Sequence, residues 1–88
     1  MASAETQAQP GPTFIVADDH PIVRDGLAAI INLQADLEVV AEAGDGETAI
    51  ARYEALRPDV LVLDLRMPRA DGLTVVQRLL AQHPEACI

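Results

Sequence analysis

The sequence predicts an α/β domain built on a parallel β-sheet. Short apolar runs alternate along the chain with segments of helical periodicity, in the order βαβαβα followed by the start of a further strand. The run at residues 60–63 is uninterrupted, which is typical of a parallel strand buried on both faces. Half of the 88 residues are hydrophobic, enough for a folded core, and the length allows one domain.

A polar leader precedes the first predicted strand. Residues 1–12 are small and polar and end in Pro-Gly-Pro, so we expect a disordered tail there and a folded domain at residues 13–88. No apolar stretch opens the chain or is long enough to span a membrane. We therefore expect a cytoplasmic protein that does not associate with membranes.

The first strand–helix pair follows this leader. Residues 14–17 form a short apolar strand that ends at Asp18 and Asp19. The next helix should begin at Pro21, because proline lacks an N–H that the first turn does not need. Its buried face is predicted to carry the residues that recur with the helical period, which are Val23, Leu27, Ile30, Ile31 and Gln34.

The second pair begins with a strand at residues 37–41 and a turn at residues 44–46. Asp45 in that turn is a plausible N-cap for the helix that follows. This helix should end at Pro58, and its apolar face is predicted to comprise Ala49, Ile50, Tyr53 and Leu56.

The third strand, at residues 60–63, ends in Asp64. After a loop, Asp71 should cap a helix that stops near His83. The predicted buried face of that helix comprises Leu73, Val76, Leu79 and Leu80. Residues 86–88 are apolar and are expected to open a fourth strand.

Composition excludes several functions. The net charge is −8, and all six basic residues are arginine, so this acidic chain is not expected to bind a nucleic-acid backbone. The single cysteine, Cys87, cannot form an internal disulfide or a paired-cysteine metal site.

Three aspartates follow strands whose ends should lie at one edge of the sheet. Asp18 and Asp19 follow the first strand, and Asp64 follows the third. Ligand sites in open parallel sheets form beyond the carboxyl ends of the strands. If the two strands are neighbours, their tips lie about 5 Å apart and the carboxylates repel one another. A hard divalent cation would relieve this repulsion, and oxygen-only ligands favour Mg²⁺.

Structural roles could also explain these residues. Asp19 could cap the helix that begins at Pro21, and Asp64 could simply end its strand before a turn. His20, beside the acidic pair, could take part in phosphate chemistry, but a turn or cap role is the simpler interpretation.

An aspartate carboxylate beside Mg²⁺ can attack a phosphoryl group to give an acyl phosphate. Asp64 is the expected nucleophile, because it stands alone at a strand tip while Asp18 and Asp19 hold the ion. Phosphatases with an aspartyl nucleophile place a second aspartate two residues later. That position is Arg66, which argues against such an enzyme.

The sequence resembles the receiver domain of response regulators in bacterial two-component signalling. The resemblance rests on FIVADDHP at residues 14–21, VVAEAGDG at residues 39–46, RPDVLVLDLRMP at residues 57–68 and DGL at residues 71–73. It covers residues 14–88. The first two stretches are similar to the subfamily whose members usually carry a C-terminal helix-turn-helix output domain.

This resemblance implies a flavodoxin-like sheet of order 2-1-3-4-5, truncated after the start of strand four, and a regulatory phosphoacceptor rather than an enzyme. Asp64 would accept the phosphoryl group from a sensor histidine kinase. The Mg²⁺ ligands would be Asp18, Asp19, Asp64 and the backbone carbonyl of Arg66. The loop beside the site would be shaped by Met67, Pro68, Asp71 and Gly72.

The chain departs from the family pattern at its C-terminal end. A receiver continues to a Ser or Thr after strand four and a Lys after strand five, whereas this sequence stops at Ile88 and contains no Lys. We therefore expect Mg²⁺ binding but slow phosphorylation and no hydroxyl switch, since losing a cation that stabilises phosphoryl transfer costs much of the rate.

An alternative function is a non-signalling interaction module. Without a last helix, part of one sheet face would be bare, and such apolar surface usually recruits a partner. We expect a homodimer or an oligomer formed by exchange of elements. On this alternative, assembly would depend neither on metal nor on Asp64.

Overall fold

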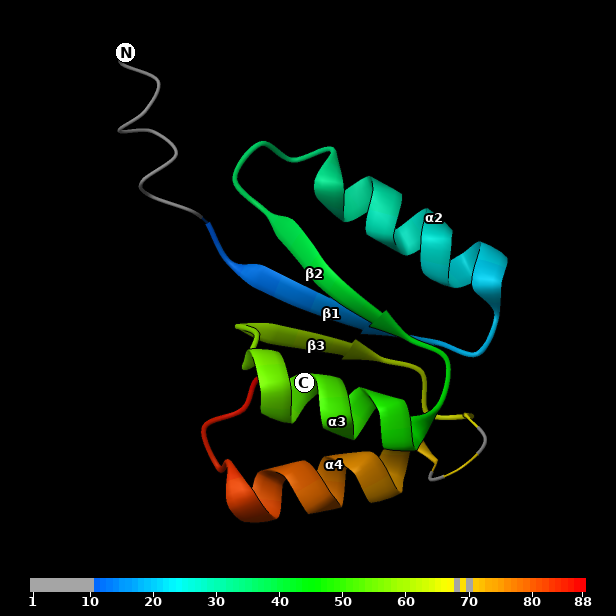
Figure 1. The fold of residues 1–88 in the computed structure, drawn as a ribbon, viewed down its shortest axis with the longest axis vertical. Coiled ribbons are helices and arrows are strands. Elements are labelled where there is room, and N and C mark those ends of the chain that lie inside the picture. The colour runs from blue at the N-terminus through cyan, green and yellow to red at the C-terminus, as the bar shows by residue number, and fades with distance from the viewer. Residues whose placement is uncertain (1–10, 68, 70) are drawn as a thin grey trace.

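The structure is a computed structural model that describes residues 11–67, 69 and 71–88. Three strands form a parallel sheet of order β2-β1-β3, which confirms the predicted α/β fold class (Figure 1). Most of the leader predicted at residues 1–12 lies outside the described residues, so its disorder stays a prediction. The elements are β1 (Thr13–Ala17), α2 (Pro21–Asn32), β2 (Glu38–Ala43), α3 (Gly46–Leu56), β3 (Val60–Leu63) and α4 (Gly72–Gln82).

The sheet register brings the carboxyl ends of the strands level with one another. Ala17, the last residue of β1, is paired with Ala43 of β2 and with Leu63 of β3. The pairing continues one residue further, because the Asp18 amide donates to the Ala43 carbonyl at 3.0 Å and the Asp64 amide donates to the Ala17 carbonyl at 2.9 Å. The first residue after β1 and the first after β3 therefore emerge side by side.

The hydrophobic core lies between the sheet and the helices α3 and α4. Ile15 and Ala17 of β1 and Leu61 of β3 are buried in it, together with side chains from both helices. Val16 of β1 is also fully buried but points to the opposite face, where α2 contacts β1 and β2. In Figure 1 the strands accordingly lie between α2 and the pair formed by α3 and α4.

Both predicted aspartate caps are present. Asp45 accepts a hydrogen bond from the Thr48 amide at 2.7 Å, and Asp71 accepts one from the Thr74 amide at 2.9 Å. These bonds satisfy amides that have no partner within the helix. The helix α2 begins at Pro21 as predicted.

The buried face of α2 agrees with the prediction only in part, since Leu27 and Ile31 are half-buried and the other three predicted residues are exposed. Val23 is 48% exposed and Ile30 is 62% exposed, and Gln34 lies beyond the end of the helix at Asn32. The side chain that α2 buries is Ala28. Among the described residues the main contacts of the helix are with β1 and β2, and apolar side chains that do not face these strands stay exposed.

The faces of α3 and α4 also differ in part. Leu56, Leu73 and Leu80 are exposed, whereas Val75 and Leu79, one helical turn apart, are buried. The two helices lie side by side, so α4 turns Val75 and Leu79 toward the core that it shares with α3.

The second strand also runs to Ala43 rather than ending at residue 41.

His83 ties the ends of these two helices together. It is the C-cap of α4, as the sequence suggested, and it is buried. Its Nε2 lies 3.1 Å from a carboxylate oxygen of Glu54 in α3, and its ring centroid lies 5.4 Å from that of Tyr53.

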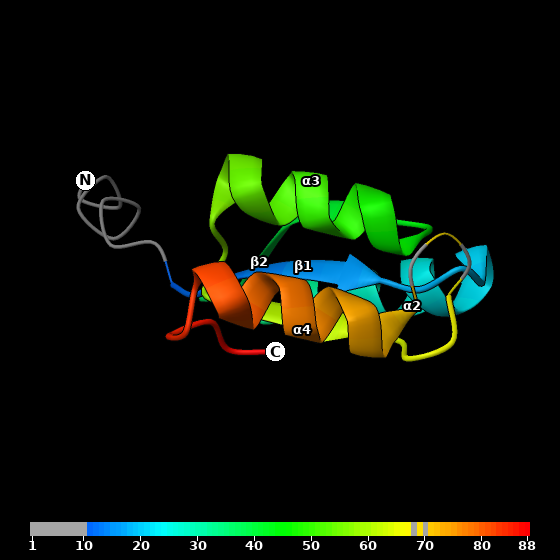
Figure 2. The same ribbon diagram turned by 90° about the horizontal axis from the view of Figure 1, so that it is seen from below.

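The segment after α4 turns back along the helix toward the sheet (Figure 2). The Leu61 amide of β3 donates to the Cys87 carbonyl at 2.9 Å, although residues 86–88 are not themselves a strand. This is the contact expected where a fourth strand would begin.

Within the part of the chain that the structure describes, every helix is too short or too polar to span a membrane.

Candidate functional site

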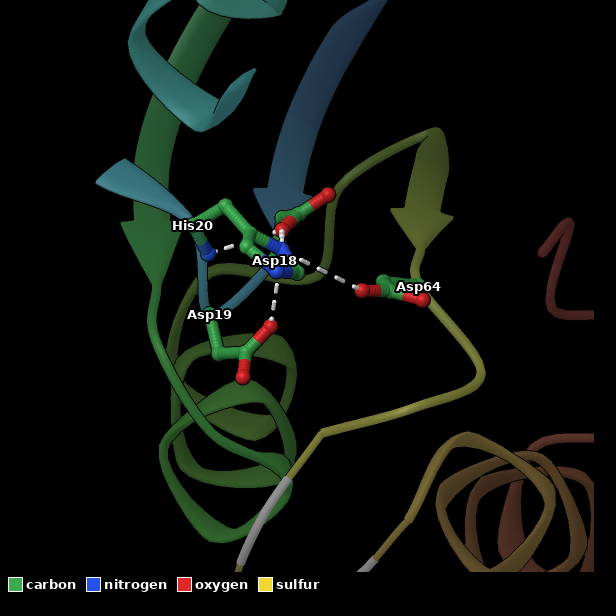
Figure 3. Close-up of side chains that lie close together, drawn as sticks. All are labelled: Asp18, Asp19, His20 and Asp64. Carbon is green, nitrogen blue, oxygen red and sulfur yellow. Dashed lines mark hydrogen bonds and ion pairs between the residues drawn. The ribbon is translucent and has the colours of Figure 1, made fainter. Parts of the chain in front are cut away.

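The structure brings Asp18, Asp19 and Asp64 together at the carboxyl edge of the sheet (Figure 3). With His20, they offer potential ligand atoms that all lie within 4.8 Å of one another. The sheet produces this convergence, because β1 and β3 are hydrogen-bonded neighbours whose ends are level.

His20 lies at the centre of this cluster. Its Nδ1 is 2.9 Å from Asp18 Oδ1, 3.0 Å from Asp19 Oδ1 and 4.0 Å from Asp64 Oδ2. His20 occupies the N-cap position of α2, but its side chain makes no capping hydrogen bond. The sequence suggested the turn and cap position but not the ring's place among three carboxylates. Its adjacency to the acidic pair was the only available signal.

The electrostatics of the cluster follow from these contacts. The hydrogen bond to Asp18, followed by the negative charge of Asp19, raises the pKa of His20 above its usual value. The hydrogen bond that the His20 amide donates to Asp18 Oδ1, at 2.8 Å, is the main cause that lowers the pKa of the Asp18 carboxyl. Both shifts favour the charged forms, so the site is organised for positive charge facing negative charge.

The structural alternatives for the aspartates can be compared with this geometry. The alternative in which Asp19 caps α2 is wrong, since His20 occupies the N-cap position and no side-chain capping hydrogen bond is made there. Asp64 does close a turn, because its Oδ1 accepts a hydrogen bond from the Arg66 amide at 3.0 Å. Its Oδ2, however, faces the cluster and is available for chemistry.

The oxygen atoms present fit a hard divalent cation. Asp19 Oδ1 is buried and accepts no hydrogen bond; the His20 nitrogen lies near it without hydrogen-bond geometry. A buried carboxylate oxygen without a donor is costly unless a cation compensates it. The three carboxylates supply the oxygen ligands that Mg²⁺ prefers. The imidazole nitrogen of His20 is not expected to be a ligand, because Mg²⁺ is a hard cation that favours oxygen.

The loop after β3 is anchored to its surroundings. Met67 is buried in the core, and Gly72 begins α4 in close contact with the backbone at Asp64. The Glu47 amide at the start of α3 donates to the Arg69 carbonyl at 3.0 Å. Pro68 lies outside the described residues, so its predicted loop-shaping role remains a prediction, as does metal binding by the Arg66 carbonyl.

Two residues beside the site were not singled out from the sequence. Arg24 of α2 donates to the Asp18 carbonyl at 3.0 Å and pairs with Glu42 of β2 at 3.1 Å. Neither the helical period nor any motif indicated that these side chains meet.

Comparisons with known proteins agree with the fold and the acidic cluster. A family model described as the response regulator receiver domain matches residues 14–88. The chain belongs to this family. The resemblance of the sequence to receiver domains is thereby confirmed, and the receiver domain is a regulatory unit.

Curated relatives include proteins with different activities. The oxygen regulatory protein NreC of Staphylococcus epidermidis is 45% identical over 76 residues, which are 85% of this chain and 35% of that protein. The protein-glutamate methylesterase/protein-glutamine glutaminase 5 of Anaeromyxobacter dehalogenans is 44% identical over 79 residues, which are 90% of this chain and 22% of that protein. The receiver chain thus spans about a fifth to a third of the length of these relatives.

Solved structures show the same architecture. The signal receiver domain of NarL from Mycobacterium tuberculosis is similar with a TM-score of 0.83 and 35% identity, over 88% of this chain and 62% of that chain. A LuxR-family response regulator from Aurantimonas is similar with a TM-score of 0.82 and 33% identity, over 86% of this chain and 54% of that chain. The receiver fold of the described residues is therefore that of the flavodoxin-like response regulators.

Proposed function

We propose that this receiver domain accepts a phosphoryl group on Asp64 from the phosphohistidine of a sensor histidine kinase. Mg²⁺ would be held by Asp18, Asp19, Asp64 and the backbone carbonyl of Arg66. The observation that carries the proposal is the convergence of the three carboxylates, with Asp64 Oδ2 facing the other two.

The chemistry assigned to Asp64 is nucleophilic. One of its carboxylate oxygens forms a bond to phosphorus while the phosphorus–nitrogen bond of the donor breaks, which leaves an acyl phosphate on Asp64 and a free imidazole on the kinase. Mg²⁺, when bound, neutralises charge on the transferred oxygens. Asp18 and Asp19 supply the ligands for the ion, and the turn closed by the Arg66 amide holds the Asp64 carboxylate in place.

The cluster is poorly suited to remain without a cation. Two carboxylates about 4 Å apart repel each other by about 4 kcal/mol at an effective dielectric constant near 20. The hydrogen bond to Asp18, followed by the negative charge of Asp19, raises the pKa of His20 at the centre of this cluster. A divalent ion among the same oxygens would offset the repulsion between the carboxylates with two positive charges.

We propose that the 88-residue chain by itself accepts phosphate slowly. Among the described residues, His20 is the only basic side chain that an ion pair joins to Asp64, and the distance is 4.0 Å. All basic residues of the chain are arginines. A side-chain cation bound directly to the transferred group contributes several powers of ten to phosphoryl-transfer rates, so phosphorylation of this chain, which contains no lysine, should be slow.

Phosphotransfer from acetyl phosphate in the presence of Mg²⁺, followed by intact-protein mass spectrometry, tests the proposal. We expect slow addition of one phosphoryl group, which chelation of the metal abolishes. Asp64→Asn should not be labelled, whereas the matched control Asp25→Asn, at an exposed position of α2, should behave as wild type. Equal labelling of Asp64→Asn and wild type would rule out Asp64 as the acceptor, and rapid labelling would contradict the slow rate.

A second proposal is that the chain self-associates through apolar side chains of α2. Val23 and Ile30 are exposed although both are large and apolar, and their helical spacing of i and i+7 places them on one face of α2. A second copy of the chain would bury them. This association should proceed equally with Asp64→Asn and without metal, unlike phosphorylation.

A further inference from the structure

We propose that Arg24 is the positioning residue of the acidic cluster, and that it holds the turn carrying Asp18 and Asp19 by bridging that turn to Glu42 of β2. The inference rests on the proposed function, because the geometry that Arg24 maintains is the geometry needed for Mg²⁺. It goes further by assigning a role to a side chain outside the cluster.

The guanidinium group of Arg24 makes two different hydrogen bonds. Its Nη1 donates to the backbone carbonyl of Asp18 at 3.0 Å, and its Nε donates to Glu42 Oε1 at 3.1 Å. The Arg24 side chain is 22% exposed and that of Glu42 is 36% exposed, so these contacts are partly shielded from water. The Arg24 amide also donates to the His20 carbonyl at 2.9 Å, which joins the same residue to the other end of the turn.

The carbonyl that Arg24 holds belongs to the peptide unit between Asp18 and Asp19. The orientation of this peptide constrains the directions of the Cα–Cβ bonds of Asp18 and Asp19, and therefore where their carboxylates can lie. Asp18 is only 8% exposed, so its carbonyl has little access to water as a substitute partner. The strand pairing of the Asp18 amide with Ala43 holds one side of the residue, and Arg24 holds the other.

The neighbouring chain leaves room for the guanidinium. A Cβ atom placed on Gly44 would lie 3.0 Å from Arg24 Nη1, which is tighter than ordinary contact. Glycine at this position, directly after β2, therefore allows Arg24 to reach across the end of that strand. Glu42, whose carboxylate accepts the other hydrogen bond of Arg24, lies two residues before Gly44 and within β2.

A second arginine provides a comparison within the molecule. Arg78 of α4 pairs with Glu47 of α3 at 3.0 Å, but both side chains are about half exposed and neither contacts the cluster. Arg24 differs because its second donor reaches the main chain of a cluster residue. Groups that orient metal ligands from outside typically change metal affinity about 10- to 100-fold when they are removed.

The test compares Arg24→Met with the matched control Arg78→Met in the full chain. Mg²⁺ affinity is measured by titration calorimetry, and exchange of the His20 amide proton is measured by NMR without metal. We expect Arg24→Met to weaken Mg²⁺ binding about tenfold or more and to accelerate His20 exchange, whereas Arg78→Met should match wild type in both. Arg24→Met with the affinity and exchange rate of Arg78→Met would overturn the proposal.

Two further variants separate positioning from loss of folding. Arg24→Lys keeps the charge and should recover part of the Mg²⁺ affinity, while Glu42→Ala should weaken binding in wild type but have no further effect in Arg24→Met. Additive effects of Glu42→Ala and Arg24→Met would contradict a shared bridge. If wild type binds no Mg²⁺, the proposed function fails, and the His20 exchange rates still decide whether Arg24 holds the turn.

Discussion

Single side chains at the edge of this sheet serve the backbone and the site at once. Asp64 uses Oδ1 to close a turn with the Arg66 amide and presents Oδ2 to the cluster. Asp18 Oδ1 accepts hydrogen bonds from both the amide and the ring of His20. The carboxylates of Asp18 and Asp64 are therefore held by local hydrogen bonds before any ion or phosphoryl group arrives, which is the preorganisation that such chemistry needs.

Gly72 is predicted to be essential to the position of Asp64. A Cβ atom at this residue would lie 2.8 Å from the Asp64 carbonyl oxygen and would also clash with the backbone of Leu65. Gly72→Ala should therefore lower the free energy of unfolding by about 1–3 kcal/mol and should shift the NMR signals of Asp64. Chemical denaturation and amide spectra of the variant provide the measurement.

Gly26→Ala is the matched control for that substitution. Gly26 lies inside α2, and an added Cβ would meet no atom within 4 Å. Alanine favours the helix more than glycine, so Gly26→Ala should raise the free energy of unfolding by about 0.5–1 kcal/mol. If Gly72→Ala proved as stabilising as Gly26→Ala, the close approach of α4 to Asp64 would be refuted.

The three aspartates could be predicted from the sequence, and their neighbours could not. Strand ends are visible as apolar runs that stop at acidic residues, and parallel pairing then places these residues together. The positions of the His20 ring and the Arg24 guanidinium depend on side-chain directions that no spacing specifies. Arg24 meets Glu42 across 18 residues of sequence, through the packing of α2 beside β2.

At the scale of elements, helix starts were predictable because capping is local. Asp45 and Asp71 each accept a hydrogen bond from the amide three residues later, as their sequence positions indicated. Helix faces were less predictable. Apolar residues repeat around much of α2 and α4, and only the contact with the sheet or with α3 selects Ala28, Val75 and Leu79 for burial.

The stability of the folded state should depend on pH, because the helix α4 is capped by the titratable side chain of Asp71. The hydrogen bond from the Thr74 amide lowers the pKa of the Asp71 carboxyl below its usual range. A lowered pKa in the folded state means that the carboxylate stabilises the fold above the unfolded pKa and that this contribution is lost as the pH falls through the folded pKa. Asp71→Ala should therefore lower the melting temperature by a few degrees at pH 7, and the deficit should disappear in acid.

Asp71→Asn is the control for the acid dependence. Asparagine caps helices about as well as aspartate but does not titrate. Thermal melts followed by circular dichroism should show Asp71→Asn close to wild type at neutral pH and above it in acid. A deficit of Asp71→Ala that is the same at every pH would show that the charge of Asp71 contributes nothing.

At the scale of the whole molecule, helices cover the two sheet faces unequally. The helices α3 and α4 share a continuous core with one face, whereas α2 alone packs on the other (Figure 1). Large apolar side chains on α2 consequently remain exposed, among them Val23 and Ile30. Exposed apolar surface of this kind is typical of a surface that another protein covers.

Self-association through α2 should be visible in solution. Sedimentation velocity should show a concentration-dependent dimer of the wild-type chain that Ile30→Gln weakens. Ile22→Gln is the control, because Ile22 is 87% exposed in the first turn of the helix and lies about 100° around the helix from Val23. A wild-type chain that stays monomeric at high concentration, or equal weakening by both variants, would contradict an interface centred on Ile30.

The central claim is that Asp18, Asp19 and Asp64 form one divalent-cation site. The most direct test is a Mg²⁺ titration of the isotopically labelled chain, followed by amide NMR. Saturable shifts should appear at Asp18, Asp19, His20 and Asp64 and should vanish in Asp18→Asn, a variant that keeps the side-chain shape and loses the charge. The claim would be contradicted by shifts that do not saturate, or by a saturable response that survives unchanged in Asp18→Asn.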